Sequence, residues 1–137
     1  MAHCIFCKIL EGDISAEKIF ENSDALAFLD LHPCAVGHTL VIPKIHAATL
    51  TDLPEAVASA LLPAVKEVVE KLTKAIQPEG FTIGINNGQA AGQAISHLHF
   101  HIIPRFAGDG GGNLHTVVQN EVGEPLAETA KRIRAVN

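Results

Sequence analysis

The stretch SHLHFHII, residues 96–103, decides how this sequence is interpreted, because three histidines alternate there with apolar residues. Successive side chains of a β-strand point to opposite faces, so His97, His99 and His101 would share one face and the apolar residues the other. A single histidine in such a place is most often an ordinary half-buried polar residue. Strict alternation of three predicts a strand with one chemical face and one core face.

The spacing also limits what the three histidines can do together. At about 3.3 Å per residue, His97 and His101 would lie roughly 13 Å apart along a strand and could not meet at one small atom. His99 is flanked on both sides, so a nucleophile or base there would have an orienting partner and a proton donor nearby. His99 is therefore the candidate for the reactive centre.

The segment before this strand, INNGQAAGQAIS at residues 85–96, is rich in small residues and carboxamides. Small residues let backbone N–H groups approach a ligand closely, and carboxamides donate hydrogen bonds without adding charge. The alternative is a plain surface turn, since glycine-containing loops are common. Its position next to the histidines favours a phosphate-binding loop.

The three cysteines comprise a C-x-x-C pair, Cys4 and Cys7, and a lone Cys34. An odd number argues against a disulfide scaffold, and the pair reads either as half of a metal site or as a redox pair. A tetrahedral zinc site would need two further ligands, most naturally histidines. The candidates on chemistry alone are His46, His97, His38, His32, His3 and His115, and spacing does not choose among them. The plain alternative is two small buried cysteines.

The order of predicted elements indicates an α+β domain with a mainly antiparallel sheet. Apolar residues at helical spacing predict one long helix over residues 51–77, with a kink or a junction of two helices at Pro63. The remaining predicted elements are a turn or short helix at 4–10, two strands within 17–31 around a turn at 21–24, a loop at 32–38, strands at 39–44, 81–88 and 97–106, a flexible segment at 106–115, and a short helix within 124–136.

Length and composition predict a single domain over residues 1–137 with a core of its own, since 47% of residues are hydrophobic. The formal charge is −5 and no cluster of Lys and Arg is dense, which argues against nucleic acid as a partner. No apolar run approaches the roughly 20 residues of a membrane span, and the N-terminus lacks signal-peptide features. We therefore expect a cytoplasmic protein with no membrane partner.

The chain resembles the histidine triad (HIT) superfamily, most closely its Hint-like branch and the bacterial members with an N-terminal C-x-x-C. The motifs that carry the resemblance are CIFCKI at the front, GHTLVIPKIH in the middle, and HLHFHII with GQ a few residues upstream. They cover residues 4–105 and leave 106–137 as a C-terminal tail. The resemblance implies a five-stranded HIT-like sheet with one long helix and a short C-terminal helix, and a homodimer formed through the long helix and an adjoining strand.

The resemblance also implies catalytic roles for four histidines. His99 would attack the α-phosphorus and form a covalent nucleotidyl-histidine intermediate, and His101 would contact the phosphate and the leaving group. His97 and His38 would support and orient the nucleophile.

A purine nucleotide is the implied ligand. The resemblance places Asn86, Gly92, Gln93 and Ala94 at the α-phosphate together with His99 and His101, Asp30 at the ribose hydroxyls, and Ile5, Phe6, Ile9, Phe28 and Leu31 around the base. Structural zinc would be held by Cys4, Cys7, His46 and His97. Ala94 departs from a serine common in Hint-like enzymes, and the tail lacks the tryptophan-containing C-terminus of some Hint proteins, so leaving-group preference does not transfer.

Three functions remain open at this point. The leading hypothesis is a hydrolase or transferase acting on a nucleoside phosphoramidate or a dinucleoside polyphosphate-like substrate. The second is a zinc-stabilised purine nucleotide-binding module with little turnover. The third is a cupin-like metalloenzyme that uses H-x-H as metal ligands, although the sequence lacks the expected downstream glutamate and contains too much helix for an all-β barrel.

Overall fold

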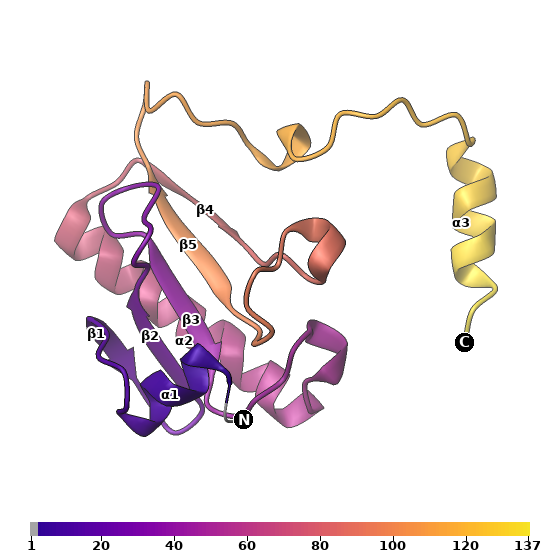
Figure 1. The fold of residues 1–137 in the computed structure, drawn as a ribbon. Coiled ribbons are helices and arrows are strands. Elements are labelled where there is room, and N and C mark those ends of the chain that lie inside the picture. The colour runs from indigo at the N-terminus through magenta and orange to yellow at the C-terminus, as the bar shows by residue number, and fades with distance from the viewer. Residues whose placement is uncertain (1–2) are drawn as a thin grey trace.

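The computed structural model describes residues 3–137, so Met1 and Ala2 of the expected single domain lie outside the described residues. Its sheet has five strands in the order β1-β2-β3-β5-β4, and every neighbouring pair is antiparallel, as predicted. Figure 1 shows this sheet with the long helix α2 along one face. The elements are α1 (Ile5–Glu11), β1 (Lys18–Glu21), β2 (Ala25–Leu29), β3 (Thr39–Pro43), α2 (Glu55–Ile76), β4 (Gly80–Gly84), β5 (Phe100–Arg105) and α3 (Leu126–Arg134).

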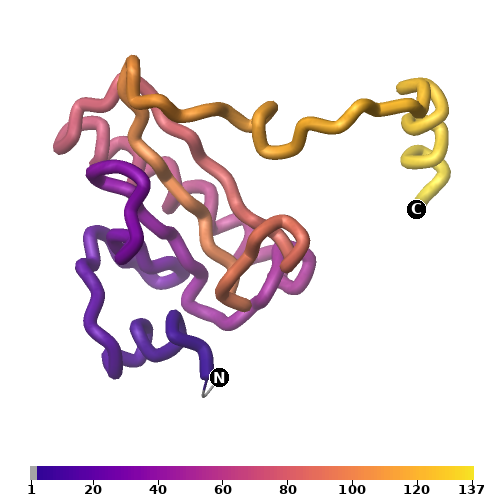
Figure 2. The backbone as a smooth tube through the Cα atoms, turned by 45° about the horizontal axis from the view of Figure 1, so that its top comes forward, coloured from indigo at the N-terminus to yellow at the C-terminus, as the bar shows by residue number. Residues whose placement is uncertain are grey.

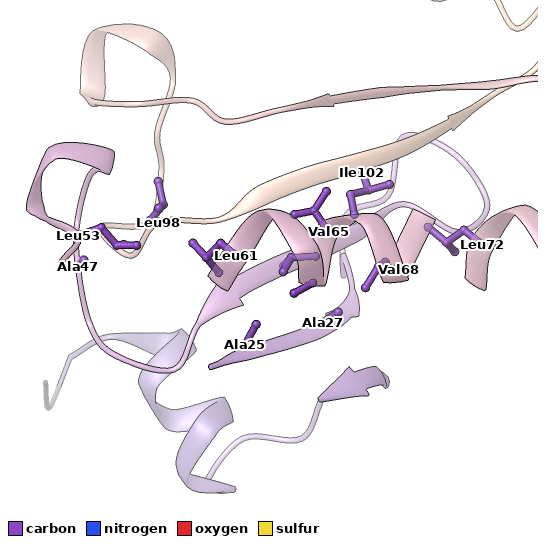
Figure 3. Close-up of a cluster of buried hydrophobic side chains, with 12 residues drawn as sticks. Ala25, Ala27, Ala47, Leu53, Leu61, Val65, Val68, Leu72, Leu98 and Ile102 are labelled. Atoms are coloured by element: carbon purple, nitrogen blue, oxygen red, sulfur yellow. The ribbon is translucent and has the colours of Figure 1, made fainter. Parts of the chain in front are cut away.

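The core between α2 and the sheet follows from the apolar spacing of the helix. Leu61, Val65, Val68 and Leu72 recur three or four residues apart and are buried on one side of α2. They meet small and branched side chains from the strands, including Ala25, Ala27 and Ile102 (Figure 3). Val41 belongs to the same buried cluster. The small alanines of β2 let the helix approach the sheet closely.

Pro63 does not divide this helix, so the expectation that two helices might meet there is wrong. A single helix of 22 residues runs from Glu55 to Ile76 through Pro63. Proline removes the N–H that would bond to the carbonyl four residues earlier, at Ser59. Both Pro63 and Ser59 are exposed, so water can hydrogen-bond to the freed carbonyl and the helix continues.

The opposite face of the sheet is covered in part by α1. Phe6 and Ile9 pack against Phe28, Leu40 and further strand residues that point away from α2. Strands β2 and β3 are therefore buried on both faces, which explains why their sequences read as continuous apolar runs rather than alternating ones. This second apolar layer forms the floor beneath the candidate site.

Strand β5 begins later than expected, at Phe100 rather than at His97. Residues 97–99 approach it with other partners: the His97 N–H donates to the Ile95 carbonyl at 2.9 Å and the Leu98 N–H donates to the Ala47 carbonyl at 2.7 Å. Only His101 of the three alternating histidines therefore belongs to the regular strand. The prediction of one long strand over residues 97–106 is wrong at its start.

The chain leaves the sheet after β5 as an extended arm, residues 107–125, that ends in α3. Figures 1 and 2 both show this arm passing beyond β4 and α3 standing apart from the rest of the chain. No residue of α3 is buried. None of the helices in the described part of the chain has the length and apolar character needed to cross a bilayer.

Candidate functional site

A cavity of about 290 Å³ lies between α1, the end of β2 and the start of β5. Its apolar part contains all five residues expected around the base, which are Ile5, Phe6, Ile9, Phe28 and Leu31. Sequence reasoning missed four further lining residues, Ala16, His32, Leu40 and Ile95. Ala16, Leu40 and Ile95 look like ordinary core residues in the sequence, and only the tertiary fold brings them here.

The polar end of the same cavity gathers most of the residues expected at the phosphate. Asn86, Gly92, Ala94, His99 and His101 line it together with Asp30. Gln93 does not line the cavity. Its amide nitrogen donates to the Ala48 and Ile95 carbonyls at 2.6 and 3.0 Å, and its amide oxygen accepts from the Gly88 N–H at 2.8 Å. Gln93 thus holds the loop in shape from behind.

The loop between β2 and β3 brings Asp30 and His38 together. The Asp30 N–H donates to the His38 carbonyl at 2.9 Å, which closes the loop over residues 30–38. Gly37 completes the turn with a φ of 85°, a backbone conformation that favours glycine. A Cβ at Gly37 would also lie 3.2 Å from Ile76, so the loop packs closely on the end of α2.

The hydrogen bond of His99 assigns its tautomer. Its Nδ1 lies 2.7 Å from the His97 carbonyl, which can only accept, so Nδ1 carries the proton. The lone pair of the neutral ring is then on Nε2, and the ring borders the cavity while only 8% exposed. Phe6 packs edge-on against it with ring centroids 5.2 Å apart. The ring of His99 is thus held in one orientation by the His97 carbonyl and by Phe6.

His38 orients His101 rather than the candidate nucleophile. The Cys34 N–H donates to His38 Nδ1 at 3.0 Å, which places the His38 proton on Nε2. That Nε2–H donates to His101 Nδ1 at 2.9 Å, so neutral His101 carries its own proton on Nε2. Because its Nδ1 is taken by His38, His101 offers this N–H to the cavity that it lines.

Asp30, His38 and His101 lie close enough together to suggest a second metal cluster. The assigned tautomers argue against that interpretation. A metal on His38 Nε2 would displace the proton fixed there by the Cys34 amide and leave an imidazolate. Asp30 Oδ2 lies 3.5 Å from His38 Nε2, so the group is better described as a hydrogen-bonded relay.

Burial lowers the pKa of both relay histidines. For His38, desolvation outweighs the opposing effect of the Asp30 carboxylate on the pKa. For His101, desolvation acts together with the neighbouring His99 and His38 and lowers the pKa to about 4. Both rings are therefore neutral at pH 7 in the absence of a ligand.

The lowered pKa of His101 predicts a loss of stability in acid. The unfolded chain binds this proton near pH 6.5 and the folded chain only near pH 4, so between these values unfolding takes up a proton. The free energy of unfolding of the wild type, minus that of His101→Asn, should fall on the order of 2 kcal/mol from pH 7 to pH 4. Urea denaturation at several pH values measures this difference. A difference that does not vary with pH would contradict the assignment.

The four expected zinc ligands form a second cluster, beneath the N-terminal segment. The ligand atoms of Cys4, Cys7, His46 and His97 all lie within 4.8 Å of one another. His97 Nδ1 lies 3.4 Å from the Cys4 sulfur and 3.7 Å from the Cys7 sulfur, and His46 Nδ1 lies 3.4 Å from the Cys7 sulfur. Ligands of a tetrahedral zinc ion would be separated by about 3.6 Å for a sulfur and a nitrogen. The donor set therefore fits zinc in number, type and spacing.

The backbone around the cluster supports this fit. His97 Nε2 donates to the Pro43 carbonyl at 3.0 Å, which leaves the Nδ1 lone pair directed at the sulfurs. Burial and the neighbouring Cys4 raise the pKa of the Cys7 thiol, so without a bound cation this thiol stays protonated. His97 is fully buried and reaches the candidate reactive centre only through its carbonyl, which accepts from His99.

The sequence of this chain is similar to proteins of one known family. Residues 11–108 match the sequence profile of the HIT domain family. The chain is 50% identical over 102 residues to adenosine 5′-monophosphoramidase hnt1 of Schizosaccharomyces pombe. The matched segment covers 74% of this chain and 74% of that protein.

Two crystal structures resemble the whole fold. A HIT family protein from Bacillus anthracis superimposes with a TM-score of 0.85 at 36% identity, covering 97% of this chain and 93% of the other. A Zn-bound histidine triad family protein from Mycobacterium smegmatis superimposes with a TM-score of 0.75 at 32% identity, covering 98% and 92%.

Proposed function

This chain belongs to the HIT domain family, and from that premise we propose that it is a nucleotide hydrolase or transferase working through a covalent nucleotidyl-histidine intermediate. Its substrate would be a nucleoside phosphoramidate or a dinucleoside polyphosphate-like molecule. The observation that supports this most strongly is the environment of His99, whose Nδ1–H is bonded to the His97 carbonyl and whose ring borders a cavity with an apolar and a polar end.

In the first step, the His99 Nε2 lone pair attacks the α-phosphorus. The bond from phosphorus to the leaving nitrogen breaks, and its electron pair goes to that nitrogen. As the anionic substrate binds, His101 takes up a proton from water on Nδ1, and the His38 Nε2–H turns from that atom to Asp30 Oδ2, which lies 3.5 Å away. His101 then gives its Nε2 proton to the departing amine. In the second step, water attacks the phosphorus and returns a proton to His101. The bond to His99 Nε2 breaks, which releases the nucleoside monophosphate and restores neutral His99.

Cys4, Cys7, His46 and His97 would hold a structural zinc ion. Four protein ligands complete a tetrahedral site and leave no position for a water or a substrate. Such an ion would therefore act structurally, by joining the N-terminal segment to the segment that leads into β5. His97 would serve this structural site with its ring and the nucleophile with its carbonyl.

The experiment that separates this proposal from a binding module is turnover. We expect the purified chain to release AMP from adenosine 5′-phosphoramidate over many cycles. Tight binding of AMP, without release of AMP from the phosphoramidate, would favour the second hypothesis, a zinc-stabilised purine nucleotide-binding module.

Asp30 is proposed to bind the ribose hydroxyls. Its Oδ1 already accepts the His32 N–H at 2.9 Å, so the carboxylate is fixed in place at the cavity wall. Asp30→Asn should raise the Kd for AMP about tenfold, because one charged hydrogen bond is lost. Titration calorimetry measures this change, with the exposed Asp13→Asn as the control. Equal affinities in wild type and Asp30→Asn would show that the ribose role is wrong.

The proposal extends to the homodimer that the resemblance implies, formed through the long helix α2 and an adjoining strand, for which we propose β4. Strand β4 is an edge strand of the sheet, so its outer side is available for a second copy. Light scattering at micromolar concentration should give about twice the chain mass. A mass near 14.5 kDa would refute this assembly.

A further inference from the structure

Helix α1 is attached to the rest of the chain at few points. It has seven residues, and an isolated helix of this length is not stable in water. The backbone hydrogen bonds of residues 4–14 stay within that segment. Among the described residues, the only side-chain hydrogen bonds that leave the segment come from the sulfurs of Cys4 and Cys7. Both sulfurs belong to the cysteine–histidine cluster, which consists of Cys4, Cys7, His46 and His97.

The same helix forms one side of the nucleotide cavity. Phe6 and Ile9 line that cavity, whereas Cys7 between them turns its sulfur to the cysteine–histidine cluster. The Phe6 ring is only 4% exposed and packs edge-on against two histidines. Its centroid lies 5.9 Å from that of His97 in the cluster and 5.2 Å from that of His99 in the cavity. A shift of α1 would therefore be felt at both sites.

A second cavity, of about 430 Å³, connects the two sites on their solvent side. It is bordered by Cys4 and His46 of the cluster, and also by Ile5, Ala94 and Ile95, which line the nucleotide cavity as well. Cys4 and His46 are half-buried, so a metal ion or a small chelator can reach the cluster from this cavity. The wall of the nucleotide cavity is thus continuous with the surroundings of the cluster.

We propose that metal binding at the cysteine–histidine cluster and nucleotide binding in the cavity are positively coupled, and that Phe6 transmits the coupling. The inference rests on the proposed function and adds a regulation of the same site. With a metal bound, both cysteines are tied to the two histidines, and α1 holds Phe6 against the strands. The nucleotide then meets a preformed apolar wall and does not have to order it. Nucleotide affinity therefore follows the free zinc concentration.

Without a metal, α1 loses its firmest attachment. The sulfur–nitrogen contacts at 3.4 to 3.7 Å are then hydrogen bonds of a thiol, which is a weak donor. Ordering of α1 is left to the nucleotide, and its entropic cost lowers the affinity. His97 keeps its bonds to Pro43 and Ile95, and its carbonyl still holds His99. The coupling thus acts on nucleotide binding, and kcat at saturating substrate is retained.

The test measures the coupling in both directions on the full-length protein, at a temperature where circular dichroism shows the metal-free form to be folded. Calorimetry should give a Kd for AMP about tenfold higher after chelation than with zinc bound, a size common for coupled sites. In competition with a chromophoric zinc chelator, saturating AMP should lower the Kd for zinc by the same factor, because linkage is reciprocal. Residual zinc is quantified in every sample.

Phe6→Leu separates the coupling from the two binding events. Leucine keeps the position apolar but loses the ring contacts to His97 and His99, so zinc should still bind while the ratio of the two AMP Kd values falls to about threefold or less. Leu31→Ala is the control. Leu31 lines the cavity from the loop after β2, is 67% exposed, and lies outside the buried cluster around α1. It should raise both Kd values and leave their ratio at the wild-type value.

The outcomes separate the two levels of the proposal. If AMP does not bind to the zinc-loaded protein, the proposed function itself is wrong and the coupling falls with it. If AMP binds with the same Kd before and after chelation, or if the chain binds no zinc, only the coupling is overturned. A metal-free protein that is unfolded at every temperature would assign the metal to the whole fold and also overturn it. Equal ratios in wild type and Phe6→Leu would remove Phe6 from its role.

Discussion

Replacing His99 with alanine is expected to lower kcat for adenosine 5′-phosphoramidate by a factor on the order of 10⁴ or more. The reason is that the substitution removes the nitrogen that would form the bond to phosphorus. The apolar walls and Asp30 stay in place, so the Kd for AMP should change less than about threefold. Single-turnover kinetics and calorimetry on the same preparation measure both quantities.

His32→Ala is the matched control for this substitution. His32 lines the same cavity, but it is exposed and its backbone N–H, rather than its ring, contacts Asp30. Its turnover should remain within an order of magnitude of the wild type. If His99→Ala kept wild-type turnover, the nucleophile would have to be another residue.

Removal of the proposed zinc ion is expected to lower the stability of the fold without abolishing the proposed reaction. At a free ion concentration about a thousand times the Kd, binding to the folded state alone contributes about 4 kcal/mol to the free energy of unfolding. For a chain of this size, chelation should therefore lower Tm on the order of 10 °C. Cys7→Ser should behave like the chelated protein, whereas Cys34→Ser, outside the cluster, should keep the wild-type Tm.

Initial rates at low temperature show whether the metal takes part in the chemistry. His97 is also held by its Nε2–H bond to Pro43 and by its N–H bond to Ile95, so its carbonyl should stay in position for His99. The rate should thus survive chelation while the protein remains folded. A rate that falls in proportion to residual zinc, with the fold intact, would make the metal catalytic and contradict the covalent-histidine mechanism.

Much of the fold could be predicted from local patterns. The long helix followed from apolar spacing, and the β1–β2 turn followed from the sequence ENSD, where the Asn22 side chain accepts the N–H groups of Asp24 and Ala25. The start of β5 could not be predicted. Alternation at residues 97–99 looks like a strand, but their backbone groups bond to Ile95 and Ala47, a tertiary choice that no local pattern encodes.

In the candidate site, too, some features could be predicted from the sequence and others depend on tertiary contacts. The resemblance named the four residues that cluster closely enough to hold a metal ion and most of the residues that line the cavity, because motifs preserve which residue types occur. It did not supply which atom faces which neighbour. The Cys34 amide fixes the His38 tautomer, and His38 contacts His101 instead of His99. Gln93 faces the loop rather than the cavity for a similar reason, since its carboxamide satisfies three backbone groups.

The proposed mechanism depends on a covalent bond between His99 and the nucleotide phosphorus, and mass spectrometry tests for this bond most directly. The wild type would be mixed with adenosine 5′-phosphoramidate, quenched in alkali within one turnover, digested and mapped. We expect an adenylyl group on the peptide that contains His99, placed on His99 by fragmentation and absent from His99→Ala. Hydrolysis with no adduct during a single turnover, or an adduct on a different residue, would contradict it.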